Sequence, residues 1–456
     1  MEERTAAAGG EPSAVCLLDY DWLGFDLDHT LIRYSLDNLH QLCYDCFRKY
    51  LIEEADYPTD LLDIPLNQEF IKKGNVVDRK RGNILKLDSA GVVERGYHGT
   101  KPLTKEELER LYKNEPLPNF QGLSTPDWWS LTTFFEVTLA WLFAVLVDLE
   151  DTKGKQHQEE VNIYYRDYQG QSAVLYDALL YNFGQWGKGW YFPAIQKDPS
   201  KYIFKQTKVR KWLEELRNVH QKRLFIVTNS FPEYLEVLAN YAFGEDWRSL
   251  FDFISAAARK PSFFTQNNDY FEVLDLDLDV DCCLVSSTPT TELSTAEIFY
   301  GGNAKVLLDF MRKEDEKNNR HARKQGEDYH PKVLYFGDHL QYDVCIPLKF
   351  GWHTVAIVEE LEELEKLQGL EFPSDHTPYL HDAENHPWSR HLDDNAYWGS
   401  YFFCDGDGDA KKRDSFWCQH IKQGATLYVP SLERFSSFSP DHTFTNNACS
   451  AFLCNN

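Results

Sequence analysis

Short apolar runs alternate along the chain with segments of helical periodicity, most clearly in its second half. In residues 208–220, for example, Val209, Trp212, Leu213 and Leu216 share one helical face. Runs of about five apolar residues bounded by polar turns are typical of buried strands. The expected strands are residues 21–25, 223–227, 251–255, 332–336 and 354–358, and the expected helices are 208–220, 234–243 and 303–311.

This alternation predicts the fold class. It is typical of α/β proteins in which a parallel sheet carries helices on both faces. Ligands of such sheets bind outside the carboxyl ends of the strands. The polar residues of greatest interest here follow directly after expected strands, so we expect the chemistry at that edge of the sheet.

The most apolar stretch, residues 131–149, approaches the length of a membrane helix. Glu136 and Asp148 reduce its uncharged part to residues 137–147, which is 11 residues, whereas a membrane-spanning helix needs ~20. We therefore expect a buried helix of a water-soluble domain and no membrane association.

Composition narrows the function classes. A length of 456 residues allows two or three domains. A net charge of −25 disfavours nucleic-acid binding, because an acidic surface does not follow a phosphate backbone. The ten cysteines are scattered, and the N-terminus lacks the apolar region of a signal peptide. We therefore expect free thiols and a cytoplasmic location.

The C-terminal segment differs from the rest of the chain. Residues 375–456 are rich in aromatic side chains and have weak periodicity. They are too aromatic for a free tail, so we expect them to pack on the core or form an edge hairpin. Two acidic runs are not metal loops: residues 405–409 lack the later glycine and glutamate of a calcium loop, and residues 275–281 alternate as a solvated edge strand does.

Two carboxylates, Asp26 and Asp28, follow the first expected strand. Beyond the strand end the chain leaves the pleat, so both can face one pocket. One carboxylate can attack an electrophile while the other, held protonated, acts as a general acid. Repulsion between like charges raises one of the two pKa values and favours this division of roles. Taken alone, the pair is also compatible with an acidic surface turn.

Three further polar groups follow later strands. The run Thr228-Asn229-Ser230 could cradle a phosphate with its hydroxyl groups and backbone amides, although a plain helix N-cap uses the same residue types. Lys260 could neutralise a phosphoryl group or be simply solvated. Asp338 and Asp343 suit Mg²⁺, which takes one or two carboxylates together with substrate oxygens and waters.

The order of these motifs at successive strand ends (DxDxT, TNS, Lys, GDxxxxD) resembles the haloacid dehalogenase-like phosphatase superfamily. Within it, the chain is similar to the cytosolic purine 5'-nucleotidase family from about residue 20 to residue 358, and its C-terminal segment resembles one subgroup of that family. The resemblance rests on residues 81–88 (RGNILKLD), 98–100 (HGT), 252–264 (DFISAAARKPSFF), 300–303 (YGGN), 398–403 (WGSYFF), 416–418 (FWC) and 429–433 (VPSLE).

The resemblance implies a role for each motif residue. Asp26 matches the nucleophile that forms an aspartyl-phosphate, and Asp28 matches the general acid that later activates water. Lys260 matches the lysine that stabilises the phosphoryl charge. Thr228 and Asn229 match the phosphate-binding residues, and Ser230 lies beside them.

The same resemblance implies a Mg²⁺ cofactor. Asp338 matches the side-chain ligand of the metal, with Asp26 and the backbone carbonyl of Asp28 completing the protein ligands. Asp343 matches the outer carboxylate that steadies the ion and its waters. Phosphoryl transfer needs mainly in-line positioning and charge neutralisation, which this set can supply.

A domain division follows from the family pattern. We expect an N-terminal tail (1–19), a Rossmann-like core (20–34 and 206–360), an inserted mixed α+β cap (35–205) with a polar, turn-rich stretch at 73–99, and a C-terminal extension (361–456) packed on the core. The cap would close the site and help to choose the substrate, which we expect to be a nucleoside monophosphate. A homo-oligomer is reasonable for this family, although the sequence locates no interface.

One segment departs from the purine nucleotidase pattern. In that family a Lys-Gly pair follows a His-Tyr that contacts the base and precedes a phosphate-binding lysine. Here the pair Lys188-Gly189 follows Trp-Gly, and Phe192 replaces the lysine. The base pocket is therefore not carried over. Nearby aromatic residues could stack on a base, but we expect cap core for Trp186, Trp190 and Tyr191.

Two alternatives stand beside the phosphomonoesterase. A catalytically weak or inactive binding or scaffold protein would keep the core for stability, and the altered cap and long aromatic tail favour it. A phosphatase for phosphoproteins or sugar phosphates ranks last, because a large cap hinders bulky substrates. Turnover of a substrate panel separates the three.

Overall fold

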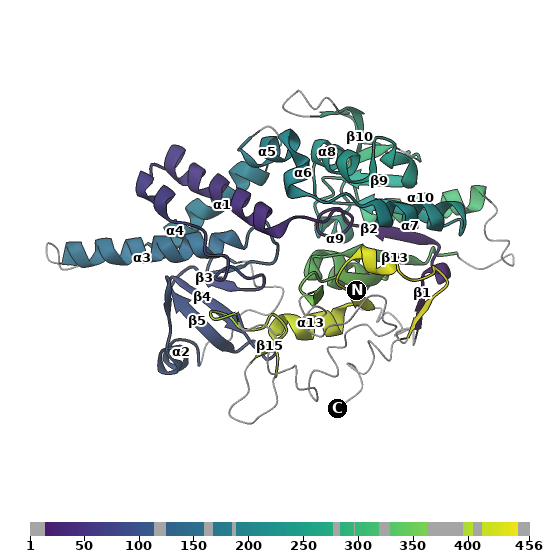
Figure 1. Cartoon of the computed structure of the whole chain (residues 1–456). Helices are drawn as coiled ribbons and strands as arrows, with labels where there is room; N and C mark the ends of the chain where they lie inside the picture. The colour runs from purple at the N-terminus through teal and green to yellow at the C-terminus, as the bar shows by residue number, and fades with distance from the viewer. Residues whose placement is uncertain are drawn as a thin grey trace, which may run out of the picture.

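The computed structural model describes residues 14–113, 125–158, 167–184, 188–276, 283–295, 297–318, 329–362, 395–404 and 413–445. Two sheets dominate it: a nine-stranded central sheet and a five-stranded antiparallel sheet that lies apart from it (Figure 1). Trp186, the run at 405–409 and residues 277–281 of the other acidic run lie outside the described residues.

The central sheet is mostly parallel, with the order β11-β10-β12-β9-β8-β2-β13-β14-β17. The strands from β12 to β17 run parallel, and β10 and β11 are antiparallel at one edge. The α/β prediction is therefore confirmed. The bounds are β2 Trp22–Phe25, β8 Arg223–Val227, β9 Phe253–Ala256, β10 Tyr270–Asp275, β11 Leu284–Val285, β12 Ile298–Gly301, β13 Val333–Gly337, β14 His353–Ile357 and β17 Leu427–Val429.

Helices pack on both faces of this sheet. On one face Phe25 of β2 meets Trp212 of α7, with ring centroids 6.2 Å apart. On the other face Trp22 of the same strand meets Phe310 of α10, also at 6.2 Å. Both faces of β2 are thus sealed, as an all-apolar strand requires. The core helices are α7 Thr207–Asn218, α8 Pro232–Phe243, η4 Trp247–Leu250, α9 Ser262–Thr265, α10 Ala304–Lys317, the π-helix η5 Leu340–Cys345 and α11 Ile346–Phe350.

The segment between β2 and α7 combines helices with the antiparallel sheet β6-β5-β4-β3-β7. The apolar stretch at 131–149 forms much of α3, as expected for a buried helix, and no helix among the described residues is long and apolar enough to cross a membrane. The bounds are α1 Leu36–Glu53, η2 Thr59–Asp63, β3 Val76–Asp78, β4 Asn83–Leu87, β5 Val93–His98, β6 Lys101–Pro102, α2 Lys105–Tyr112, β7 Trp128–Ser130, α3 Thr138–Gln158, α4 Tyr168–Phe183, α5 Tyr191–Lys197 and α6 Pro199–Tyr202.

The polar stretch at 73–99 does contain turns, and between them it forms the three strands β3, β4 and β5. All residues of β4 are buried, including the polar Asn83 and Lys86. The buried amide of Asn83 has a partner on another element, because it donates to the Tyr112 hydroxyl at 2.6 Å. Buried polar groups with partners on other elements hide the apolar alternation by which a strand is recognised.

The C-terminal extension both packs on the core and forms edge strands. β17 adds to the central sheet beside β14, and β18 pairs with β1 near the N-terminus. Thus β1, which falls in the segment expected to be a tail, is a paired strand. The bounds are β1 Ala14–Cys16, η1 Leu17–Asp19, β15 Phe403–Cys404, β16 Arg413–Asp414, α13 Phe416–Gly424, α14 Leu432–Phe435 and β18 Thr443–Thr445.

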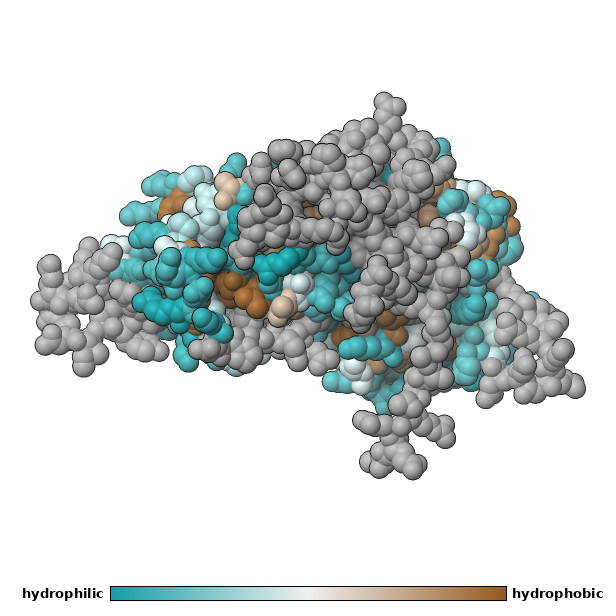
Figure 2. Space-filling model, turned by 90° about the horizontal axis from the view of Figure 1, so that it is seen from below, coloured by the Kyte–Doolittle hydropathy of each residue, from teal (hydrophilic) through white to brown (hydrophobic). Residues whose placement is uncertain are grey.

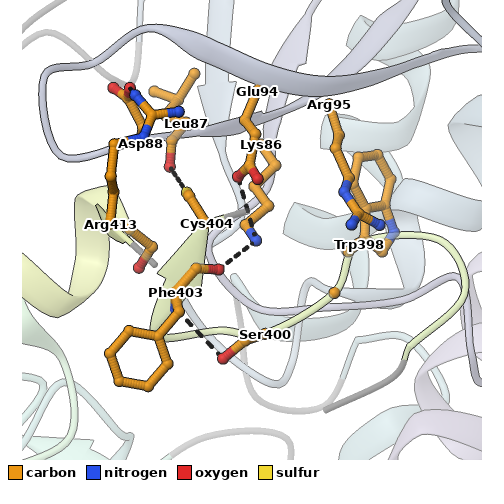
Figure 3. A network of polar contacts seen from close by, with 12 residues as sticks. Lys86, Leu87, Asp88, Glu94, Arg95, Trp398, Ser400, Phe403, Cys404 and Arg413 are labelled. Carbon is orange, nitrogen blue, oxygen red and sulfur yellow. Dashed lines mark hydrogen bonds and ion pairs between the residues drawn. The ribbon is translucent and has the colours of Figure 1, made fainter. Parts of the chain in front are cut away.

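The extension also binds the antiparallel sheet, which the sequence did not predict. Figure 3 shows the Lys86 ammonium donating to the carbonyl of Phe403, at 2.8 Å, while Arg413 pairs with Asp88 at 2.8 Å. The extension therefore ties the inserted segment to the central sheet.

A tryptophan of α13 strengthens this attachment. Trp417 Nε1 donates to Gly74 O at 2.7 Å. Gly74 has φ +90°, and a Cβ there would lie 2.3 Å from the Trp417 indole nitrogen, so only glycine admits the ring. Elsewhere the described surface seen from below is mostly hydrophilic, with separate apolar patches (Figure 2), which agrees with the net charge of −25.

Candidate active site

Asp26 lies at the carboxyl end of β2, in the middle of the central sheet. Its backbone N donates to Phe336 O of β13 at 2.8 Å, and its side chain is buried. His29, three residues further on, has φ +54°. Non-glycine residues seldom adopt this left-handed conformation, and it is enriched at functional sites. The loop after β2 is therefore held in an unusual course beside Asp26.

Asp28 faces the same cavity and is held by hydroxyl groups on both oxygens. Tyr34 donates to Oδ1, and Ser230 donates to Oδ2. The Tyr34 hydroxyl lies 2.9 Å from that of Tyr234, which lies 2.8 Å from that of Tyr191. Burial raises the pKa of all three tyrosines, so they remain neutral. A buried chain of phenols thus fixes the position of Asp28.

The TNS motif turns the chain from β8 into α8. Thr228 N donates to Ser255 O at 2.9 Å, and Ser230 N donates to Thr228 Oγ1 at 3.1 Å. Asn229 exchanges two hydrogen bonds with the backbone of Lys260, one from Nδ2 at 3.1 Å and one to Oδ1 at 2.5 Å. The second and third motifs therefore form one structural unit.

The Lys260 ammonium lies between two carboxylates. Nζ is 2.7 Å from Asp26 Oδ1 and 2.5 Å from Asp343 Oδ1. It also donates to the Tyr335 hydroxyl at 3.1 Å, and that hydroxyl donates to Val227 O at 2.6 Å. Burial opposes the charge on Lys260, but the two carboxylates raise its pKa well above the ordinary value. Lys260 is therefore a fixed positive charge beside Asp26.

Three carboxylates could hold a metal ion. One oxygen each of Asp26, Asp338 and Asp343 lies within 4.8 Å of the others. Burial raises the pKa of Asp26 and of Asp338 to about 7 and that of Asp343 to about 6, with further repulsion from neighbouring carboxylates. A divalent cation would relieve this repulsion, and oxygen donors are what Mg²⁺ prefers. The residues therefore fit the expected cofactor.

The glycine of the GDxxxxD motif has a packing role. A Cβ on Gly337 would lie 2.2 Å from Asp343 Cβ, so the β13 backbone and the side chain of Asp343 come together only at a glycine. Asp343 Oδ2 also accepts from His339 N at 3.2 Å. The motif spacing thus places the side chain of Asp343 against the carboxyl end of β13, the strand that precedes it.

One cavity of about 820 Å³ connects the motifs with the inserted segment. All eight residues named by the sequence line it: Asp26, Asp28, Thr228, Asn229, Ser230, Lys260, Asp338 and Asp343. Facing them, from the inserted segment, are Arg79, Thr125, Pro126, Trp129, Ser130, Thr132, Thr133, Phe135, Glu136, Tyr176, Phe183 and Phe192.

Of the aromatic residues near Lys188, some pack away from the cavity and one lines it. Tyr191 is fully buried, and Trp190 packs against Tyr181, with ring centroids 5.2 Å apart. Neither lines the cavity: Tyr191 belongs to the core, and the partly buried Trp190 packs against it. Phe192 does line the cavity and packs on Tyr234 at 5.0 Å. An apolar ring therefore stands at the position that the sequence resemblance matches to a lysine.

Sequence reasoning missed several residues of the site. Buried Lys73 pairs with Glu360 at 3.0 Å, and the nearby Asp338 helps to keep its pKa raised although burial opposes the charge. Arg79 and Glu136 line the cavity from the inserted segment. These residues follow no strand of the central sheet and belong to no short motif, so only the fold brings them to the site.

The fold and the cluster at the ends of its strands define the haloacid dehalogenase-like class. A model of the 5' nucleotidase family matches residues 14–386, and the chain belongs to that family. It is 30% identical to 5'-nucleotidase domain-containing protein 1 of Homo sapiens over 441 residues, which is 93% of this chain and 91% of that protein.

Two further relatives agree with this assignment. The protein of the same name from Bos taurus is 29% identical over 441 residues, covering 93% of this chain and 91% of its own length. Human 5'-nucleotidase domain-containing protein 2 is 30% identical over 356 residues, or 76% of this chain and 62% of that protein. The family expected from the motifs is confirmed.

Proposed function

We propose that this protein is a Mg²⁺-dependent phosphomonoester hydrolase of the 5'-nucleotidase type. The observation that carries the proposal is the arrangement around Lys260, whose ammonium contacts Asp26 and Asp343 in the cavity that Asp28 also lines. A nucleophile, a proton donor and a fixed positive charge are what phosphoryl transfer requires.

In the first half-reaction a carboxylate oxygen of Asp26 attacks phosphorus. The new P–O bond makes an aspartyl-phosphate, and the bond from phosphorus to the leaving oxygen breaks. Protonated Asp28 gives its proton to that oxygen, so the product leaves as an alcohol. The hydroxyls of Tyr34 and Ser230 can each donate or accept, so they hold Asp28 in both charge states.

In the second half-reaction a water molecule attacks the phosphorus of the aspartyl-phosphate. Asp28, now a carboxylate, takes the proton of the water, and the P–O bond to Asp26 breaks. Inorganic phosphate leaves and the Asp26 carboxylate is restored. The proton returns to Asp28, so one residue serves as acid and then as base.

The carboxylate cluster supports a Mg²⁺ cofactor. Asp26 and Asp338, with the backbone carbonyl of Asp28, would hold the ion, and Asp343 would steady it from outside. When bound, Mg²⁺ neutralises charge on the phosphoryl oxygens. Lys260 complements it from within the protein, because it is charged and already in contact with Asp26.

The phosphate would be held by the structural unit that the TNS motif forms with the loop of Lys260. Thr228, Asn229 and Ser230 line the cavity beside Lys260. Because Asn229 is bonded to the backbone of Lys260, this cradle is preorganised.

A nucleoside monophosphate is the proposed substrate class. The cavity, at about 820 Å³, lies within the range of sites for small organic ligands. Aromatic rings line it, among them Phe135 and Tyr342, and can pack on a flat base. The free, buried thiols of Cys43 and Cys46 favour the expected cytoplasmic location.

The test is phosphate release by the full chain from a panel of nucleoside monophosphates, sugar phosphates and p-nitrophenyl phosphate, with Mg²⁺ or with EDTA. We expect Mg²⁺-dependent release that falls at least about a thousandfold in Asp26→Asn. Asp309→Asn is the matched control, because Asp309 is an exposed carboxylate on α10. Release no greater than that of Asp26→Asn would overturn the proposal and favour a binding protein.

A further inference from the structure

Arg79 lies in the wall that faces the catalytic motifs, and it has no counter-ion among the described residues. It follows β3 directly, and its backbone N donates to Asp127 O at 2.9 Å. Its side chain lines the cavity, and within the described chain its guanidinium has no carboxylate partner and its buried Nε has no hydrogen bond. Its charge therefore remains available to an anionic ligand in the cavity.

Neighbouring cations differ from Arg79 in this respect. Arg81, two residues further along the same hairpin, pairs with Asp78 at 3.0 Å. Lys260, on the opposite wall, contacts both Asp26 and Asp343. Partial burial lowers the pKa of Arg79, because it removes part of the solvation of the charged form. An anion placed beside it would offset that cost.

Aromatic rings fix the direction of the guanidinium. It lies over the ring of Trp129, 5.1 Å from the centroid, and Tyr176 meets the same ring edge-on at 5.7 Å. Trp129 is anchored by the pairing of β3 with β7 and by its Nε1, which donates to Glu136 at 3.3 Å. A guanidinium stacked on a ring keeps its edge free for two parallel hydrogen bonds, the geometry that suits a carboxylate or a phosphate.

We propose that Arg79 is a specificity-determining residue that binds a second anionic group on the leaving group of the substrate. The preferred substrates would then be phosphomonoesters with a carboxylate or a further phosphate remote from the scissile one. This inference rests on the proposed function for the position of the scissile phosphate. The cavity is continuous between Arg79 and Lys260, so one ligand can reach both.

The experiment compares substrates that differ by one anion. One pair is adenosine 5'-monophosphate and adenosine 3',5'-bisphosphate, and the other is O-phosphoethanolamine and O-phosphoserine. For at least one pair we expect the wild type to have the higher kcat/KM for the member with the extra anion. Arg79→Met should remove this preference, lowering kcat/KM for that member by about 10- to 100-fold, mainly through KM. The pair that responds identifies the anion as phosphate or carboxylate.

Two further variants test whether the preference depends on Arg79 itself and on the geometry of its guanidinium. Lys80→Met removes a neighbouring exposed charge outside the cavity and should leave the preference unchanged. Arg79→Lys should restore part of it, because lysine keeps the charge but not the bidentate geometry. The preference is a ratio measured within one variant, so a loss of folded protein does not alter it.

Binding measurements distinguish a failure of this inference from a failure of the proposed function. Calorimetry with Asp26→Asn and the same four compounds measures affinity without turnover. If the wild type releases no phosphate but the anionic members bind more tightly only when Arg79 is present, the hydrolase is wrong and the Arg79 site stands. If neither rates nor affinities depend on Arg79 in either pair, the inference is overturned.

Discussion

The two walls of the cavity are built on different principles. The core wall places short polar motifs at the ends of parallel strands, and its lysine is paired within the protein: Lys260 contacts both Asp26 and Asp343. The wall from the inserted segment carries aromatic rings and one arginine, Arg79, which has no ion-pair partner in the described chain. The lysine of the first wall is thus already paired before a substrate arrives, whereas the arginine of the second wall has no ion pair among the described residues.

This difference indicates that the two walls have different roles, one in the reaction and the other in substrate selection. Groups that stabilise a transition state must be positioned before the substrate arrives, and tight mutual contacts provide such preorganisation. Groups that choose a substrate must instead keep unsatisfied capacity for it. The core wall therefore fits the proposed hydrolysis, and the facing wall fits the proposed preference for a second anion.

The largest expected effect within the core wall, after loss of Asp26, is that of Asp28→Asn. An amide cannot donate a proton to the leaving oxygen or take one from water, so kcat for a nucleoside monophosphate should fall by about 10²–10⁴. With p-nitrophenyl phosphate, whose leaving group needs little protonation, the first half-reaction should survive. Stopped-flow absorbance should then show a burst of p-nitrophenol stoichiometric with enzyme.

The burst distinguishes a chemical role from a structural one. Asp28 accepts hydrogen bonds from Tyr34 and Ser230, so its replacement could also disturb the loop. Equal losses for both substrates with no burst would show that Asp28 only holds the loop in place. Asp309→Asn should behave as the wild type does with each substrate.

The core wall could be predicted from sequence because its residues follow recognisable strands at fixed short spacings. Asp26, Lys260 and Asp343 are scattered over more than 300 positions, yet parallel strands bring their carboxyl ends to one edge. Most of the expected strands agree with the structure within two residues, because an apolar strand sealed by helices has an unambiguous pattern. The roles of these residues stay predictions.

The inserted segment, which carries the facing wall, could not be predicted in the same way. β4 buries Asn83 and Lys86, whose partners Tyr112 and Phe403 lie in a later helix and in the C-terminal extension. No local pattern reveals such partners. Arg79 likewise looks like an ordinary hairpin cation in the sequence, and only its placement over Trp129 distinguishes it. Long-range contacts, which a single sequence does not display, define this wall.

A second prediction concerns metal and pH at the core wall. In the metal-free protein the pKa values of Asp26 and Asp338 are about 7, against ~3.9 in an unfolded chain. Between these values the folded state binds more protons than the unfolded state, so metal-free stability should fall as pH rises from about 4 to 7. Mg²⁺ needs the ionised carboxylates and should oppose that fall.

Differential scanning fluorimetry at pH 5.5 and pH 7.5, with and without Mg²⁺, measures this effect. At a concentration of 100 times its Kd, Mg²⁺ should add about 2.7 kcal/mol to the free energy of unfolding at the higher pH, and clearly less at the lower pH. Asp338→Asn should reduce the shift, whereas Arg79→Met on the other wall should not. A shift independent of pH would mean that the ion binds elsewhere.

The prediction with the smallest expected effect tests whether a change in one wall alters the function of the other. Burial lowers the pKa of His339 to about 3, so its ring is neutral. Its Nδ1 accepts from Tyr342 N at 3.2 Å, and a neutral ring must then carry its proton on Nε2, which donates to Thr132 Oγ1 at 3.1 Å. This hydrogen bond joins the inserted segment to the loop that bears Asp338.

Thr132→Val keeps the shape of the side chain but removes the acceptor. The variant also loses the longer hydrogen bond from the Thr132 hydroxyl to Glu136 Oε1, at 3.3 Å. The loss of the hydrogen bond to His339, at about 0.5–1.5 kcal/mol, predicts a 2- to 10-fold fall in kcat/KM. If the contact only positions the metal-site loop, steady-state kinetics should show the same fall for both members of each substrate pair, because selectivity resides at Arg79. Thr133→Val, on the same wall, is the matched control. A change in the ratio within a pair would instead show that the two walls act as one unit, and the division of labour between them would have to be abandoned.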